Sequence, residues 1–221
     1  KWLEYLDVND FSSFQEQVNN YEPDYLFHLA ALTNLEYCEK NKDETYMTNT
    51  LSVENAVILA NQLNIPLLFI STAGIFNGNK DFYDDWDIPS PIGHYAKSKY
   101  YAELYVKENA NKYFICRAGW MMGGGPKKDK KFINMIMYQL KNGAKEIFIV
   151  NDKGGTPTYT HDFSKTVSDL IKTNYFGLYN MVCGGLTTRL DVAKEILMIL
   201  GMEKNVRINP VDSTHFQDSY F

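Results

Sequence analysis

Short apolar runs that alternate with helical patterns constrain the fold of this chain most strongly. Three such runs span residues 25–31, 66–71 and 113–117 and are rich in aliphatic and aromatic side chains. Between them, residues 43–64 carry their apolar side chains on one helical stripe, and a second helical pattern begins at Tyr95. Strands that alternate with helices are typical of βαβ units, so the sequence predicts an α/β fold with a doubly wound parallel sheet.

The pattern changes after Trp120, where a glycine-rich break precedes shorter and more irregular segments. We predict that residues 1–120 and 156–182 form the domain that contains the parallel sheet. Residues 121–155 and 183–221 are predicted to form a smaller α/β lobe.

Composition excludes several classes of function. The net charge of the 221 residues is −5, and the basic cluster at residues 127–131 is short and interrupted by Asp129, so we expect no nucleic-acid partner. No apolar run has the roughly 20 residues that a membrane helix needs, so no membrane partner is expected. Three scattered cysteines fit a reducing, cytoplasmic location. Because the sequence starts with Lys1, we expect that an N-terminal segment is missing.

A hydroxyl group at a strand end and a Tyr–Lys pair on a helix suggest a proton-transfer site. The run at residues 65–70 delivers Ser71 and Thr72 to its carboxyl end, where open α/β sheets bind ligands. Tyr95 and Lys99 are four residues apart at the start of a helical pattern, so both side chains lie on one face. Among the 16 tyrosines, Tyr95 alone has a lysine at this spacing.

These side chains are suited to reducing a carbonyl group. A free tyrosine has a pKa near about 10, and a neighbouring lysine cation is expected to lower it. Tyr95 could then donate a proton to a carbonyl oxygen while Thr72 holds that oxygen by a hydrogen bond. The hydride must come from a cofactor.

The remaining polar residues have simpler interpretations. His28 ends its strand and is expected to be a hydrogen-bonded, partly buried side chain. The other histidines have no ligand-like spacing, and Asp84, Asp85 and Asp87 are interpreted as a solvated acidic loop, so no metal site is predicted. Trp120 either packs in the core or stacks against a sugar or a base.

The chain carries six motifs in a fixed order: HLAALT, NTLSVEN, ISTAGIF, YAKSKYYAE, ICRAGW and DKGGTPT. Their order and spacing resemble the extended short-chain dehydrogenase/reductase family, in particular its dTDP-4-dehydrorhamnose reductase branch. The resemblance implies a Rossmann-like domain that binds NADP or NAD in reduced form. It also implies that the small lobe binds a nucleotide sugar.

The resemblance assigns roles to matching positions. Tyr95 is the acid/base, Lys99 is its pKa partner and a ribose contact, and Thr72 polarises the carbonyl group of the substrate. Cofactor contacts are expected at Asp7, Val8, Leu29, Ala30, Ala31, Thr33, Asn49, Tyr95 and Lys99. Substrate contacts are expected at Thr72 and Trp120.

This sequence departs from the family pattern at three places. The glycine-rich turn that anchors the pyrophosphate is absent, so we expect the first βα element to lie before Lys1. Ala73-Gly74 follows Thr72 where the family usually has Asp-Tyr, and Met121-Met122 follows Trp120 where it has Val-Tyr. The last two changes put the identity of the sugar in question more than the type of reaction.

The implied function is NAD(P)H-dependent reduction of the 4-keto group of a nucleotide-linked deoxysugar, as in dTDP-rhamnose biosynthesis. Two alternatives stay open. One is a nucleotide-sugar epimerase or dehydratase of the same superfamily, which would recycle its cofactor. The other is a non-catalytic regulatory subunit that resembles the β subunit of methionine adenosyltransferase. The sequence leaves the oligomeric state open, with a homodimer as one possibility.

Overall fold

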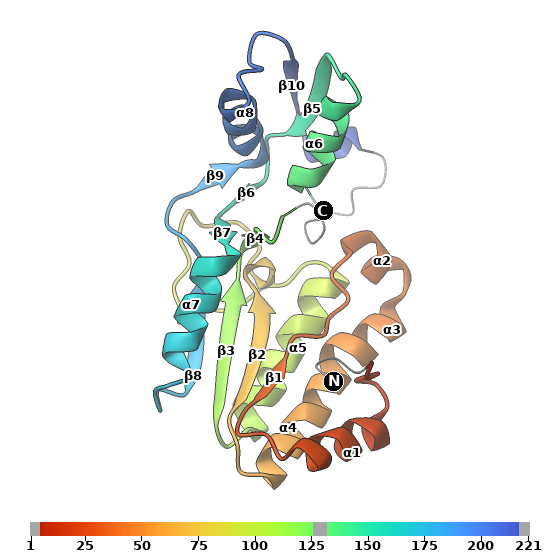
Figure 1. Cartoon of the computed structure of the whole chain (residues 1–221), viewed down its shortest axis with the longest axis vertical. Coiled ribbons are helices and arrows are strands. Elements are labelled where there is room, and N and C mark those ends of the chain that lie inside the picture. Colours follow the sequence, from red (N-terminus) through yellow and green to blue (C-terminus); the bar gives the residue numbers. More distant parts are fainter. Residues whose placement is uncertain (1–4, 126–131, 217–221) are drawn as a thin grey trace. The chain divides into compact units, whose positions relative to one another are not determined.

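The computed structural model describes residues 5–125 and 132–216, which divide into two compact units (Figure 1). The first unit contains residues 1–118 and 169–181, and the second contains residues 119–168 and 182–219, within the described ranges. The sequence of residues 2–7 also suggested a strand, but residues 2–4 lie outside the described residues, as does the basic cluster at 127–131. Residues 5–7 have no regular structure.

The first unit is built on a four-stranded parallel sheet. Its strands are β1 (Leu26–His28), β2 (Leu67–Thr72), β3 (Tyr113–Ala118) and β8 (Gly177–Met181), in the order β1-β2-β3-β8. All three pairings are parallel. The predicted parallel α/β fold is confirmed, and the carboxyl ends of all four strands meet at one edge of the sheet.

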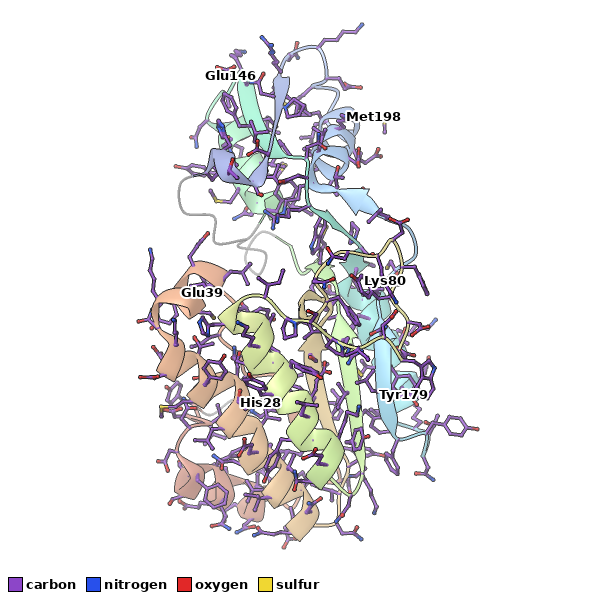
Figure 2. The ribbon with its side chains drawn as sticks, turned by 180° about the vertical axis from the view of Figure 1, so that it is seen from behind. His28, Glu39, Lys80, Glu146, Tyr179 and Met198 are labelled. Carbon is purple, nitrogen blue, oxygen red and sulfur yellow. The ribbon has the colours of Figure 1, made fainter. Side chains whose placement is uncertain are left out.

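Three helices cover one face of this sheet: α1 (Phe11–Tyr21), α4 (Ser52–Gln62) and α5 (His94–Asn109) (Figures 1 and 2). The core between them and the sheet contains apolar residues from every layer, namely Phe14, Val18, Val53, Ala56, Val57, Leu59, Ala60, Leu67, Phe69, Ala102, Val106 and Ile115. Each fully buried aliphatic or aromatic side chain stabilises the fold by about 1.5–3 kcal/mol. This packing fixes helix α5 against strands β2 and β3.

The single helix expected at residues 43–64 is interrupted in the structure. Helix α3 (Lys42–Tyr46) is followed by a π-helical turn, η1 (Met47–Leu51), before α4 begins at Ser52. A π-turn inserts an extra residue into the helix and is frequently found at functional sites. The apolar stripe continues through the interruption and does not reveal it. The Asn49 side chain of this turn is fully buried.

The second unit is a small α/β assembly. Its core lies between helices α6 (Phe132–Lys141) and α8 (Arg189–Ile199) and the parallel pair β5 (Glu146–Val150) and β10 (Arg207–Val211). A second parallel pair joins β4 (Trp120–Met122) to β7 (Pro157–Tyr159), and an antiparallel pair joins β6 (Gly154–Gly155) to β9 (Thr187–Thr188). Thr188 and Asp191 form a capping box at the start of α8.

Two details differ from the sequence-based prediction. No separate strand was predicted directly after residues 113–117, but β3 ends at Ala118 and Trp120 begins strand β4. Residues 156–168 were predicted to belong to the first domain, whereas the structure groups them with the second unit; they include most of helix α7 (Thr160–Leu170). Across residues 5–125 and 132–216, no helix is long and apolar enough to cross a membrane.

Candidate active site

Thr72 ends strand β2 at the carboxyl edge of the sheet. Its backbone is extended, and its Oγ1 accepts a hydrogen bond from the backbone N–H of Gly74 at 3.0 Å, at the start of the 3-10 turn η2 (Ala73–Ile75). Because the oxygen accepts this bond, the hydroxyl proton can be donated to another group. The preceding hydroxyl, that of Ser71, is buried and has no hydrogen-bond partner in the described part of the chain.

Tyr95 is the second residue of helix α5, and its side chain meets Thr72. Burial raises the pKa of the Tyr95 phenol, and a hydrogen bond with the Thr72 side chain acts in the opposite direction. The predicted lowering of this pKa by Lys99 is absent, since the net shift is upward and no contribution comes from Lys99. A phenol with a raised pKa is protonated at neutral pH and is therefore a proton donor.

Lys99 lies one helical turn beyond Tyr95 and is almost completely buried. Its Nζ is 4.1 Å from the centroid of the Phe69 ring, and it forms no hydrogen bond or ion pair with the described residues. Burial lowers the pKa of Lys99 to about 7, although the Glu103 carboxylate opposes the shift. A buried ammonium group without a partner favours a polar or anionic group beside it.

Asn49 links the segment after β1 to the helix that carries Tyr95. Its Oδ1 accepts from the Leu32 N–H at 2.8 Å, and its Nδ2 donates to the Leu32 carbonyl at 3.0 Å and to Ser98 Oγ at 3.1 Å. Ser98 in turn donates to the carbonyl of Tyr95 at 2.8 Å. Both amide hydrogens of Asn49 are thus used inside the protein, so this residue fixes the positions of its neighbours.

The other expected cofactor contacts lie in two segments of the first unit. Asp7 and Val8 belong to the turn before α1, where the Asp7 carboxylate accepts from the Asn9 N–H at 3.0 Å. Leu29, Ala30, Ala31 and Thr33 follow β1 at the carboxyl edge of the sheet. Leu29 is 64% exposed despite its apolar side chain. Their roles in cofactor binding stay predictions.

Trp120 lies in the second unit and is half-buried. Its ring packs so closely on Gly155 that a Cβ there would lie 2.2 Å from a ring atom. The Arg189 guanidinium lies 5.8 Å from the Trp120 ring centroid. The predicted contact between Trp120 and the sugar stays a prediction, as does the sugar contact of Thr72.

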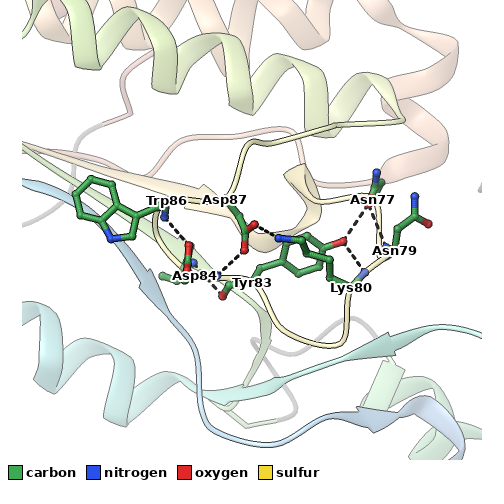
Figure 3. Close-up of polar contacts among 8 residues, drawn as sticks. Asn77, Asn79, Lys80, Tyr83, Asp84, Trp86 and Asp87 are labelled. Carbon is green, nitrogen blue, oxygen red and sulfur yellow. Dashed lines mark hydrogen bonds and ion pairs between the residues drawn. The ribbon is translucent and has the colours of Figure 1, made fainter.

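The loop between Thr72 and Tyr95 is held by its own polar contacts (Figure 3). The Asp87 carboxylate binds the Lys80 ammonium and the Asp84 N–H, and the Tyr83 hydroxyl donates to Asn77 Oδ1 at 2.9 Å. The ring of Tyr83 also stacks on Phe76, with centroids 4.3 Å apart. The loop therefore has a defined conformation between the two halves of the site.

Part of the acidic loop is more than a solvated surface. The Asp85 carboxylate accepts a hydrogen bond of 2.5 Å from the N–H of Asn180 in β8, which corrects the sequence-based interpretation for this residue. No cluster of three or more potential metal ligands occurs in the part of the chain that the structure describes.

Comparison with known proteins identifies the family. The family model described as "RmlD substrate binding domain" matches residues 3–219 of this chain. The chain belongs to this family.

Members and relatives of the RmlD family agree with this assignment. The chain is 32% identical to dTDP-4-dehydrorhamnose reductase from Bacillus anthracis str. Ames, whose crystal structure is in complex with NADP; the TM-score is 0.89, and the match covers 96% of this chain and 73% of that one. It is 29% identical to dTDP-4-dehydrorhamnose reductase from Salmonella typhimurium over 193 residues, which cover 85% of this chain and 63% of that protein. The predicted Rossmann-like fold and the resemblance to this branch are confirmed.

A third relative carries a different name. The chain is 27% identical over 199 residues to the spore coat polysaccharide biosynthesis protein SpsK of Bacillus subtilis. The matched region covers 90% of this chain and 69% of that protein. The chain thus spans 63–69% of the length of these two curated relatives.

Sequence reasoning missed one feature of the site, which is the contact of Glu39 with the start of α5. The Glu39 Oε1 accepts a hydrogen bond of 2.6 Å from the N–H of His94. The two residues are 55 positions apart, and Glu39 looks in the sequence like any other charge on a short helix. Only the tertiary fold brings the two together.

Proposed function

We propose that the protein reduces the 4-keto group of a nucleotide-linked deoxysugar with NADPH or NADH. The observation that supports this most directly is the contact between Thr72 at the end of β2 and Tyr95 at the start of α5, with Lys99 one turn further along the helix. The names of the relatives in the RmlD family point to the same reaction.

The proposed proton transfer follows from the state of Tyr95. Its raised pKa keeps the phenol protonated at neutral pH, so it can donate a proton to the carbonyl oxygen of the substrate. Thr72 donates a second hydrogen bond to the same oxygen and holds it beside Tyr95. As the carbon accepts a hydride, the oxygen accepts the Tyr95 proton, and the product is an alcohol.

The residues present are suited to a nicotinamide cofactor, which supplies the hydride when it is bound. The buried ammonium group of Lys99 has no partner within the described residues and would be satisfied by the ribose hydroxyls. The exposed segment from Leu29 to Thr33 lies at the carboxyl edge of a parallel sheet, which is where such folds bind nucleotides. We propose that the first unit binds the cofactor through these positions together with Asp7 and Val8.

The second unit would bind the nucleotide sugar. Trp120 offers a half-buried aromatic ring in this unit, and aromatic rings commonly stack on sugars and bases. Thr72, Tyr95 and Lys99 all come from one unit of one chain, so the proposed chemistry requires no second subunit. Cys38, Cys116 and Cys183 are free thiols, which is consistent with a cytoplasmic reaction.

The proposal is tested by following loss of the absorbance of NADPH or NADH with dTDP-4-dehydrorhamnose and the full-length protein. We expect consumption that depends on the sugar, and we expect Tyr95→Phe to lower kcat by about 10²–10⁴-fold because the proton donor is lost. Tyr105→Phe, on the same helix, is the matched control and should keep its activity.

Two outcomes would contradict the proposal. Equal turnover by Tyr95→Phe would remove Tyr95 from the chemistry. An absence of consumption by a protein that binds both ligands would favour an epimerase, or the regulatory-subunit interpretation if a catalytic partner co-purifies.

A further inference from the structure

Helix α5 begins without a capping side chain of its own. Its N-cap residue is Gly93, which has no side chain, and Tyr95 is only the second helical residue. The first N–H groups of a helix have no partner inside the helix, so an uncapped start frays. The position of the Tyr95 side chain therefore depends on what holds this first turn.

Glu39 supplies the missing cap from helix α2 (Leu35–Lys40) (Figure 2). Its Oε1 accepts from the N–H of His94, the first helical residue, at 2.6 Å, and its Oε2 lies 3.9 Å from Nε2 of the same residue. The side chains of Glu39 and His94 are 17% and 24% exposed, so the contact is largely shielded from water. A carboxylate at a helix N-terminus also interacts favourably with the helix dipole.

The His94 ring is fixed from its other side. The Tyr46 hydroxyl lies 3.2 Å from His94 Nδ1, and the Tyr46 ring stacks on Tyr101 of α5 with centroids 5.9 Å apart. Glu39 and Tyr46 therefore hold His94 from two helices that precede α5 in the sequence.

Helix α2 directly follows the segment proposed to bind the cofactor. The carbonyl of Leu32 in that segment accepts a hydrogen bond from Cys38 Sγ at 3.6 Å. Cys38 is the residue directly before Glu39. Two connections thus join the chain after β1 to the start of α5. One runs from Glu39 of α2 to His94, and the other runs from Leu32 through Asn49 to Ser98.

We propose that Glu39 is a positioning residue for the reaction: by capping α5 from α2, it fixes the Tyr95 hydroxyl relative to Thr72 and to the cofactor segment. This inference rests on the proposed function, because it assigns Tyr95 the role of proton donor. A positioning residue affects the rate of the chemical step more than binding, since small displacements of a catalytic group strongly reduce the rate.

Three variants of the full-length protein test the inference. Glu39→Ala removes the acceptor oxygen, and Glu39→Gln keeps an oxygen at the same place without the charge. Glu36→Ala is the matched control, because Glu36 lies on the same helix, is exposed and forms no hydrogen bond or ion pair with α5 in the described residues. For each variant, kcat, KM and hydrogen exchange of the amides of residues 93–99 are measured.

We expect Glu39→Ala to lower kcat about tenfold or more while KM for NAD(P)H changes less than about twofold. Amide exchange in the first turn of α5 should become faster, and Glu39→Gln should restore most of the rate and of the protection. If Glu39→Ala matches Glu36→Ala, or if Glu39→Gln is as slow as Glu39→Ala, the inference is wrong.

The exchange measurement separates this inference from the proposed function. If the unmodified protein consumes no NAD(P)H with any keto sugar nucleotide, the proposed reaction fails. In that case, faster amide exchange at residues 93–99 in Glu39→Ala would still support Glu39 as the cap of α5. Unchanged amide exchange would show that Glu39 is not the cap.

Discussion

Two buried basic side chains, His28 and Lys99, both lie near the Phe69 ring in the first unit. The His28 ring centroid is 6.3 Å from that of Phe69, and Lys99 Nζ is 4.1 Å from it. Burial, and to a lesser extent the nearby positive charge of Lys99, lower the pKa of His28 to about 4. His28 Nε2 and Ser52 Oγ are 3.0 Å apart, which suits a neutral ring. The interior therefore opposes a second positive charge beside Lys99.

This arrangement makes the stability dependent on pH. The unfolded chain protonates His28 near about pH 6.5, whereas the folded protein does so only near pH 4. The free energy of unfolding should thus decrease by roughly 2 kcal/mol between about pH 7 and pH 5 through this residue alone. Denaturant titrations at both pH values measure this decrease in the free energy of unfolding.

His28→Asn is the comparison for that measurement, because it keeps a polar side chain that does not titrate. We expect the variant to be less stable near neutral pH but to lose less stability on acidification than the unmodified protein. The same pH dependence in both proteins would show that His28 is not held neutral by the fold.

At the scale of single residues, the sequence predicted which side chains meet better than it predicted their pKa values. The four-residue spacing of Tyr95 and Lys99 and the position of Thr72 after a strand were sufficient to predict that these residues come together. The pKa direction of Tyr95 was not predictable, because it is set by burial, and burial depends on the packing of distant segments. The Glu39 contact was missed for the same reason.

Helix α5 is also anchored near its middle by a buried ion pair. Arg117 of β3 donates to the Glu103 carboxylate, with the shortest contact at 2.7 Å, and both side chains are at most 3% exposed. Glu103 lies one turn beyond Lys99 on the helix. The pair therefore fixes the axial position of the helix that carries Tyr95.

Removal of one partner of this ion pair should strongly destabilise the folded protein. We expect Glu103→Leu to lower the free energy of unfolding by about 3–5 kcal/mol, because it leaves the Arg117 charge buried and uncompensated. The double change Glu103→Leu with Arg117→Met should recover much of that loss, since no buried charge remains. Chemical denaturation of the single and double variants measures both effects.

A matched control is the exposed pair of Lys172 and Asp169, whose side chains are more than 60% exposed. Removing Asp169 should change stability by less than about 1 kcal/mol. An equally small effect of Glu103→Leu would contradict the anchoring role, and so would a double variant that is no more stable than the single one.

At the scale of elements, periodicity predicted most helices and strands but not their interruptions. The strands at residues 66–71 and 113–117 and the helix from Thr188 follow directly from apolar spacing and capping residues. The π-turn η1 inside the helix expected at residues 43–64 was not predictable, because it is stabilised by contacts with other elements, including the bond of Thr50 Oγ1 to the Ser98 carbonyl at 2.8 Å.

At the scale of the whole molecule, the sequence predicted a sheet domain and a smaller lobe, and the structure contains two compact units. From the sequence, we predicted that the chain re-enters the sheet domain at residue 156, whereas the first unit of the structure resumes at residue 169. The difference arises from α7, whose apolar stripe shows that it is buried but not against which unit. Packing partners of this kind are not encoded in local periodicity.

In the proposed reaction, hydride is delivered to the C4 carbonyl carbon of a nucleotide sugar while Tyr95 protonates the oxygen. The most direct test is a single turnover of the full-length protein with reduced cofactor that carries deuterium at the transferred position, followed by mass analysis of the sugar. We expect one deuterium bonded to C4 of the product and about 10²–10⁴-fold slower transfer in Tyr95→Phe. A product without deuterium, or cofactor recovered unconsumed after turnover, would contradict it.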